Sequence, residues 1–294
     1  CGLAARQGPH AVAWSVRVLP PFRSRRHLAE KLSRLRQLDG QNRSLLRGPG
    51  TEFDSLREYV IGDDVRSIDW RAAARRGDVM VRTWRPERDR RILVVLDTGR
   101  TSAGRVGGIP RLDAAMDATL LLTALAVRAG DRVDLIAFDR RLRARVMGAP
   151  RSSVLASFTA AMAPLEAALT ETDAAALASM VLTVSRHRGL VVLFTDLNPA
   201  VIEESLLPAL GALAARNRLM IAAVADPRLD EMAAARGSAA DMYDAAAAEW
   251  ALGQRQRIVS LLRQRGVQVV EAPPDRLPSA LADAYLAVKA AGRL

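Results

Sequence analysis

Apolar residues recur along most of this chain in short unbroken runs, which alternate with longer stretches of helical spacing. The runs 91–97, 189–197 and 217–226 are apolar on both faces, as strands buried inside a parallel sheet are. Stretches such as 111–130 and 201–216 between them show the spacing of helices. This alternation predicts an α/β fold: a doubly wound, mainly parallel sheet with helices on both faces.

Three segments differ in composition along the chain. The alternation of strands and helices covers 89–294 and predicts a sheet domain. A shorter segment, 44–88, is dense in charged and aromatic residues and predicts a small polar module. Within it, 65–76 is expected to form a helix, and 78–87 alternates as a half-buried strand does. The first segment, 1–43, is a basic lead.

The lead contains two weaker patterns. The alternation over 12–22 predicts the end of a strand at Pro20 and Pro21. Leucines at helical spacing then predict a helix over 23–40 that stops at Gly40. Its basic face has two interpretations: a solvated surface helix, or a helix that docks on a membrane or a partner. The basic face comprises Arg25, Arg26, Lys31, Arg34 and Arg36.

Charge narrows the classes of partner only slightly. The formal net charge is +11, and Lys31 and Lys289 are the only lysines, so arginine supplies nearly all the positive charge. Arginine contacts carboxylates and phosphates through paired hydrogen bonds, which admits nucleic acid, anionic lipid or acidic proteins. A coding preference for alanine and arginine would give the same net charge and arginine content without any such partner. Because the charge is spread along the chain and few residues are aromatic, we expect no specific nucleic-acid recognition.

Cys1 is the only cysteine, so no disulfide can form within the chain, and a reducing compartment fits. It stands where methionine would be expected, and two interpretations stay open. Either the chain is a fragment whose upstream part is missing, or Cys1 is the lipidated first residue of a mature lipoprotein. The longest apolar runs, such as 119–127, fall short of the ~18 residues that a spanning helix needs. No signal-peptide layout is present.

Acidic residues end three of the predicted strands: Asp97, Asp196 and Asp226. The carboxyl ends of parallel strands meet at one edge of a sheet, where ligands bind. Thr101 and Thr172, in the loops DTGRTS and LTETD, add hydroxyl groups. Oxygen ligands of this kind suit a hard cation such as Mg²⁺. The alternative is that Asp97 and Asp196 cap helices or anchor loops.

A long motif in the polar module resembles one family. The chain resembles the domain of unknown function 58, whose members look like variants of the von Willebrand factor type A domain. The resemblance extends over about 44–290 and into the strand RILVVLD. The motif residues are Gly50, Glu52, Phe53, Leu56, Arg57, Glu58, Tyr59, Gly62, Asp63, Asp64, Arg66, Ile68, Asp69, Trp70, Ala73, Val81 and Arg82.

The resemblance implies a metal-ion-dependent adhesion site, which has the motif D-x-S-x-S together with a Thr and an Asp from later loops. Asp97 and Thr101 match its first and third positions, and Thr172 and Asp196 are the candidates from the later loops. Gly99 stands where the middle serine should be, so one oxygen ligand for Mg²⁺ or Mn²⁺ is lost. Metal affinity should fall, or the site is vestigial.

The resemblance also implies a partner and a location. Relatives are usually encoded beside MoxR-type AAA+ ATPases, and they often begin with two membrane-spanning helices. This favours the interpretation of the chain as a fragment whose lead, 1–43, is the remnant of a membrane-proximal region. The chain would then be cytoplasmic, with the arginines of the lead beside anionic lipid.

Acids and arginines are balanced in the polar module, which allows two interpretations. An internal network of ion pairs and caps would brace the segment onto the sheet domain, with Trp70 and Tyr59 as apolar anchors. The same surface could also dock the ATPase. The candidate partner-binding residues are Arg57, Asp63, Asp64, Arg66, Asp69 and Trp70.

The sequence therefore predicts a non-enzymatic interaction protein, an adaptor or partner of a MoxR-type ATPase, with a degenerate metal-binding site. Two alternatives stay open. A metal-assisted hydrolase could use the same acids, but it needs a general base, and no histidine stands near them in the sequence. A binder of anionic lipid or nucleic acid driven by arginine would show steeply salt-dependent binding.

Overall fold

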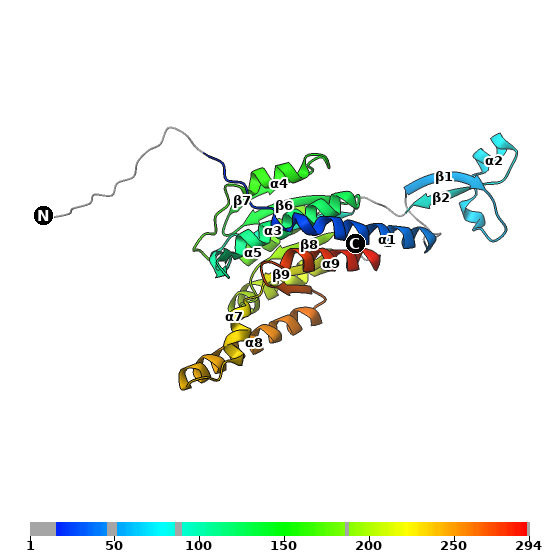
Figure 1. Ribbon diagram of the computed structural model, residues 1–294. Coiled ribbons are helices and arrows are strands. Elements are labelled where there is room, and N and C mark those ends of the chain that lie inside the picture. Colours follow the sequence, from blue (N-terminus) through cyan, green and yellow to red (C-terminus); the bar gives the residue numbers. More distant parts are fainter. Residues whose placement is uncertain (1–15, 46–51, 86–89, 186–187, 293–294) are drawn as a thin grey trace.

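The computed structural model describes residues 16–45, 52–85, 90–185 and 188–292. A six-stranded sheet forms the centre of the sheet domain, in the order β10-β9-β8-β3-β6-β7 (Figure 1). Its strands are β3 (Arg91–Asp97), β6 (Arg132–Phe138), β7 (Leu142–Val146), β8 (Leu190–Phe194), β9 (Arg218–Val224) and β10 (Gln268–Ala272). All neighbouring strands run parallel except β7, which pairs antiparallel with β6.

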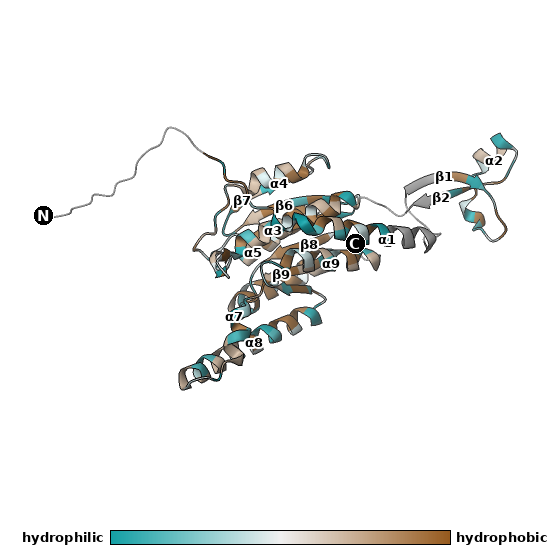
Figure 2. Ribbon diagram, in the orientation of Figure 1, coloured by the Kyte–Doolittle hydropathy of each residue, from teal (hydrophilic) through white to brown (hydrophobic). Residues whose placement is uncertain are grey.

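The order of the strands places a switch point at β3. The chain continues from β3 to β6 on one side and later to β8 on the other side. Both neighbours are parallel to β3, so their carboxyl ends meet beside that of β3. Figure 2 shows hydrophobic residues along these central strands, as expected for strands covered on both faces. The predicted doubly wound α/β fold is confirmed.

Helices cover both faces of the sheet and enclose two apolar cores. Alternate residues of β3 point to opposite faces, so Ile92, Val94 and Leu96 join one core while Leu93 and Val95 join the other. On the first face lie α3 (Arg111–Arg128), α4 (Val154–Met162) and α9 (Leu277–Ala290). On the second lie α5 (Ala174–Val184), α6 (Leu207–Arg216) and the carboxyl end of α8 (Ala239–Gln264).

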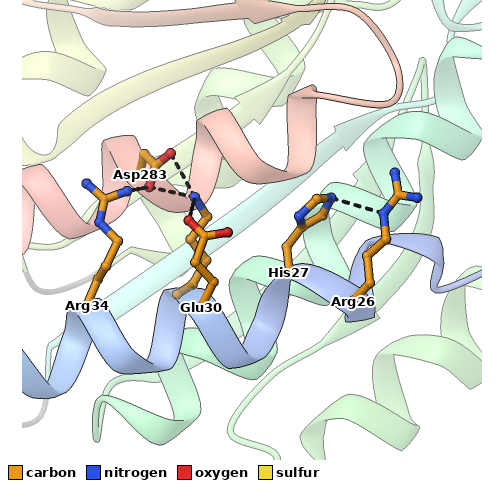
Figure 3. A network of polar contacts seen from close by, with 6 residues as sticks. Arg26, His27, Glu30, Arg34 and Asp283 are labelled. Atoms are coloured by element: carbon orange, nitrogen blue, oxygen red, sulfur yellow. Dashed lines mark hydrogen bonds and ion pairs between the residues drawn. The ribbon is translucent and has the colours of Figure 1, made fainter.

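The basic helix of the lead is part of the sheet domain. It comprises η1 (Arg23–His27) and α1 (Leu28–Leu45), which pack against α3 and α9. Lys31 is buried, and its ammonium group contacts both carboxylate oxygens of Asp283 in α9 at 2.9 Å (Figure 3). Arg34 contacts the same carboxylate at 2.5 Å. One face of this helix is therefore held by α9.

Two predictions for the lead are wrong. The helix does not stop at Gly40 but continues to Leu45, since one glycine costs a helix only about 1 kcal/mol. The described part of the predicted strand, 16–22, contains no strand. Val16 and Val18 are exposed there, so the apolar alternation does not correspond to a face buried in a sheet. The remainder of that prediction lies outside the described residues.

The polar module is a β-hairpin with a helical insertion. β1 (Glu52–Glu58) pairs antiparallel with β2 (Met80–Arg85), and η2 (Val65–Ser67) and α2 (Trp70–Arg76) connect them. Figure 1 shows the module beyond the carboxyl end of α1. The helix and the second strand predicted from the sequence are present with shorter bounds.

Some elements carry no clear sequence signal. The short strands β4 (Arg105–Val106) and β5 (Ile109–Pro110) form a small hairpin before α3, and α7 (Pro227–Ala234) packs along α8. Pro208 is the second residue of α6, which continues directly from the π-helical turn η4 (Val201–Leu206). Within the part of the chain that the structure describes, no helix is both long and apolar enough to cross a membrane.

Candidate functional site

Asp97 ends β3 at the switch point and is only 3% exposed. One carboxylate oxygen, Oδ1, accepts hydrogen bonds from the Gly99 amide at 2.8 Å and from the Thr172 hydroxyl. The other, Oδ2, accepts from Thr195 Oγ1 at 2.8 Å and from Thr101 Oγ1 at 3.5 Å. The carboxylate thus joins the loop after its own strand to the end of β8 and to the loop before α5.

Gly99 is required by this arrangement for lack of space rather than for its backbone angles. A Cβ atom at this position would overlap the Thr172 hydroxyl and approach Thr170 O at 3.0 Å. The main-chain N–H of Arg100 also donates to Thr170 O, at 2.8 Å, which brings the two loops together. Gly99 thus replaces the expected serine, and the Thr172 hydroxyl occupies the space that the serine side chain would need.

Asp196 lies two residues beyond β8 and makes different contacts. Arg111, at the start of α3, contacts its Oδ1 at 2.5 Å, and Arg255 in α8 contacts the same oxygen at 2.9 Å. Arg255 also reaches Glu271 in β10, at 2.7 Å. Burial alone would lower the pKa of Arg255, but the carboxylates of Asp196 and Glu271 outweigh it and raise that pKa above its ordinary value.

The structure therefore brings together three of the four predicted metal ligands: Asp97, Thr101 and Thr172. Asp196 lies at the same edge of the sheet, but two guanidinium groups neutralise its charge. A divalent cation prefers anionic oxygen ligands, and adjacent guanidinium groups repel it. The donors present do not fit a resident Mg²⁺ or Mn²⁺ ion well. Neither Asp97 nor Asp196 is the cap of a helix, whereas Asp226 caps α7.

Sequence reasoning missed three residues of this site. Thr195 reaches Asp97, although only its neighbour Asp196 seemed relevant in the run FTDL. Arg111 and Arg255 hold Asp196 from helices that are distant in the sequence. Arg111 follows the turn GRVGGIP and begins a helix, which is a weak signal, whereas nothing in the sequence around Arg255 singles it out.

The predicted partner-binding acids of the module serve its own backbone. Asp64 accepts a hydrogen bond from the Arg66 amide and caps η2. Asp69 accepts from the amides of Arg71 and Ala72 and caps α2. It also pairs with Arg82 at 2.8 Å, and this contact, together with the amides, lowers the pKa of Asp69. These acids brace the module from within.

A second ion pair holds the end of β1 to the turn that follows it. Arg57 contacts Asp63 Oδ1 at 2.6 Å, and this hydrogen bond raises the pKa of Arg57. Asp63 Oδ2 accepts from the Val60 amide at 3.0 Å. Both contacts lie inside the module, so the network predicted to brace the segment shapes the module itself.

Trp70 is not the buried anchor that the sequence suggested, because it is 69% exposed. Ile61, Val60 and Val65 in the same connection between β1 and β2 are exposed as well, Ile61 by 97%. We call Val60, Ile61, Val65 and Trp70 the apolar tip of the module. Arg66 and Arg71, also exposed, lie in the same connection. A hairpin with one short helix has too little interior to bury these side chains.

Other metal chemistry finds no support among the described residues, since no three His, Cys, Asp or Glu side chains gather in a cluster there. The neighbouring acids Asp63 and Asp64 accept hydrogen bonds from main-chain amides of the module instead of forming an acid pair for a metal ion.

The comparison with known families agrees with the motif in the module. The model of the family described as "Protein of unknown function DUF58" matches residues 55–256, from β1 into α8. The chain belongs to the DUF58 family. The resemblance seen in the sequence is thereby confirmed, and the DUF58 match begins inside the module and continues through the sheet domain into α8.

Two curated mycobacterial proteins are similar to this DUF58 chain. The uncharacterized proteins Rv1480 of Mycobacterium tuberculosis and Mb1516 of Mycobacterium bovis are each 28% identical over 195 residues, which is 65% of this chain. The match spans only about 60% of the length of these relatives.

Solved structures also show similarity. The PilB minor pilin from Streptococcus sanguinis matches with a TM-score of 0.44 and 9% identity, over 74% of this chain and 65% of the pilin. The SpRpn10 VWA domain matches with a TM-score of 0.39 and 14% identity, over 66% of this chain and 94% of that domain.

Proposed function

We propose that this DUF58 chain is a non-enzymatic protein-interaction domain that acts as an adaptor or partner of a MoxR-type AAA+ ATPase. The ATPase is suggested by the family resemblance alone. The observation that carries the interaction role is the apolar tip, whose four large side chains are exposed on a module braced by its own ion pairs.

The architecture of the module supports a docking role. Exposed apolar side chains that gather on the surface of a folded protein often mark an interaction site. Tryptophan and arginine are also the side chains most often found at the energetic centre of protein interfaces. Of the predicted partner-binding residues, Trp70 and Arg66 are therefore assigned to the contact, while Arg57, Asp63, Asp64 and Asp69 hold the tip in shape.

The hydrolase alternative receives less support from the candidate site. A hydrolase needs a group free to activate water, and the donors of the protein occupy both oxygens of Asp97. Of the three histidines, His27 is the one within the described residues, and it contacts Arg26 on η1. The proposal therefore assigns Asp97 to holding the loops rather than to catalysis.

The proposal predicts that Trp70→Ala lowers recovery of the ATPase by about tenfold, which corresponds to about 1.4 kcal/mol and is typical of an interface tryptophan. The measurement is co-purification of a MoxR-type ATPase with the tagged full chain from its own organism, quantified by mass spectrometry. The module should stay folded in this variant, because Trp70 is exposed.

Trp250→Ala is the matched control. Trp250 in α8 is 70% exposed, almost the same as Trp70, but it lies in the sheet domain. Its replacement should leave recovery of the ATPase unchanged. Equal recovery from wild type and Trp70→Ala, or an equal loss from both variants, would show that the apolar tip is not the docking surface.

A further inference from the structure

Two arginine side chains, Arg111 and Arg255, bring positive charge to the carboxyl edge of the sheet. We propose that this edge is a metal-independent variant of an adhesion site, in which the guanidinium groups of Arg111 and Arg255 take the place of the divalent cation. Asp196, the acid from the later loop, is held by these two arginines instead of facing a metal ion. Three sets of contacts lead to this inference.

The first is the hydrogen bonding of Asp97. An ionised carboxylate has about four acceptor sites on its two oxygens. At Asp97 these are used by one main-chain amide and three threonine hydroxyls, two donors on each oxygen. A carboxylate that serves as a metal ligand would lack hydrogen-bond donors when no cation is bound, and a buried acceptor without donors lowers the stability of the fold. Asp97 has no such deficit.

The second is the charge around Asp196. The side chains of Asp196, Arg111 and Arg255 are only 15%, 20% and 14% exposed, so solvent screens their interaction weakly. Two positive groups already contact the one carboxylate oxygen Oδ1, at 2.5 Å and 2.9 Å. A divalent cation beside them would meet repulsion from both, whereas the arginines give Asp196 the neutralisation that a cation would otherwise give.

The third is the space at Gly99. A serine at this position would have to displace the Thr172 hydroxyl, which itself donates to Asp97. The absence of a serine at position 99 is therefore what allows the Thr172 hydroxyl to donate to Asp97. The edge is complete as a hydrogen-bonded site, and it is not a metal site that has lost a ligand.

The two arginines also connect helices on opposite faces of the sheet. Arg111 comes from α3 on one face of the sheet and Arg255 from α8 on the other, and both reach Asp196 after β8. Arg255 continues to Glu271 in β10. A metal ion binds the loops of one edge, whereas these ion pairs join helices from both faces across that edge.

Thermal unfolding of the full chain tests the inference. The melting temperature of the wild type should be the same in millimolar Mg²⁺, Mn²⁺ or EDTA, and a rise with either cation would overturn the proposal. Arg111→Gln and Arg255→Gln should each lower it by about 3 °C.

Arg100→Gln is the control for a general effect of removing an arginine at this edge. Arg100 contacts Glu171 at 2.9 Å, and both side chains are more than half exposed, so the melting temperature should hardly change. If Arg111→Gln and Arg255→Gln melt like the wild type, the two arginines do not hold the site. This experiment needs no partner, so its result is independent of the docking role proposed for the apolar tip.

Discussion

Replacing Asp97 by alanine is expected to lower the free energy of unfolding by about 3 kcal/mol. The variant leaves the Gly99 amide and three threonine hydroxyls without their acceptor in a buried site. Each buried donor without a partner costs about 1–3 kcal/mol, and part of the loss is recovered as the loops relax. For a chain of this size the melting temperature should fall by about 10 °C.

Denaturant unfolding of Asp97→Ala measures this loss, and Asp226→Ala is the matched control. Asp226 also follows a strand of the sheet, but it only caps the short helix α7 through the Arg228 amide. Its replacement should cost about 1 kcal/mol. Equal losses in the two variants would mean that Asp97 does not organise the edge of the sheet.

The second large effect is expected at the carboxyl end of the chain, where Lys289→Met should cost about 3–5 kcal/mol at neutral pH. Asp131 is fully buried at the start of β6, and the ammonium group of Lys289 contacts its two oxygens at 2.9 Å and 3.0 Å. Tyr285 donates to Asp131 Oδ2 at 2.5 Å. Without Lys289 the buried carboxylate loses the cation that contacts it, although the charge of Arg90 still favours its ionised form.

The loss in Lys289→Met should depend on pH. Burial raises the pKa of Asp131 above its ordinary value, and Lys289 and Tyr285 oppose this rise. Removing Lys289 raises the pKa further, so the proton binds the folded state more readily than the unfolded state. The destabilisation is therefore greatest above the folded pKa and becomes smaller as the pH falls through it.

Denaturant unfolding at neutral and mildly acidic pH measures this dependence, with Arg236→Met as control. Arg236 pairs with Glu249 in an exposed contact at 2.8 Å, so its loss should be small at both pH values. A cost for Lys289→Met that stays constant or grows on acidification would contradict the account of Asp131.

The sequence contained enough information to predict the sheet and the position of its acids. Strand β3 is apolar at every position but its ends, which is the pattern of a strand buried on both faces, and Asp97 follows directly. Parallel strands place their carboxyl ends together, so Asp97 and Asp196 could be expected at the same edge. Thr172 lies in a loop between two helices, and only the family resemblance implied that it lies near Asp97; its hydrogen bond to Asp97 agrees with that implication.

Contacts between distant segments could not be predicted in the same way. Arg255 lies 59 residues from Asp196, and its position in a long helix does not show which strand it will reach. Thr195 and Asp196 are neighbours, but successive residues at the end of a strand point to opposite sides, so the sequence does not decide which one meets Asp97. Here the hydroxyl faces Asp97 and the acid faces Arg255.

In the module, the motif identified the family but did not predict which side chains are exposed. Its motif was specific enough to identify the family, but the exposure of Trp70 depends on how much interior the folded segment has. Two strands and a helix of seven residues enclose little volume, so the aromatic side chain remains on the surface. The acids that looked like a binding surface are mostly consumed as caps, as is common for Asp beside short helices.

The most direct test of the docking role is an equilibrium titration of the purified chain with the purified MoxR-type ATPase from the same organism. The account predicts saturable binding that Ile61→Ser, at the most exposed position of the apolar tip, weakens about tenfold, while Trp250→Ala binds like the wild type. Absence of binding by the wild type, or equal affinity of wild type and Ile61→Ser, would contradict it.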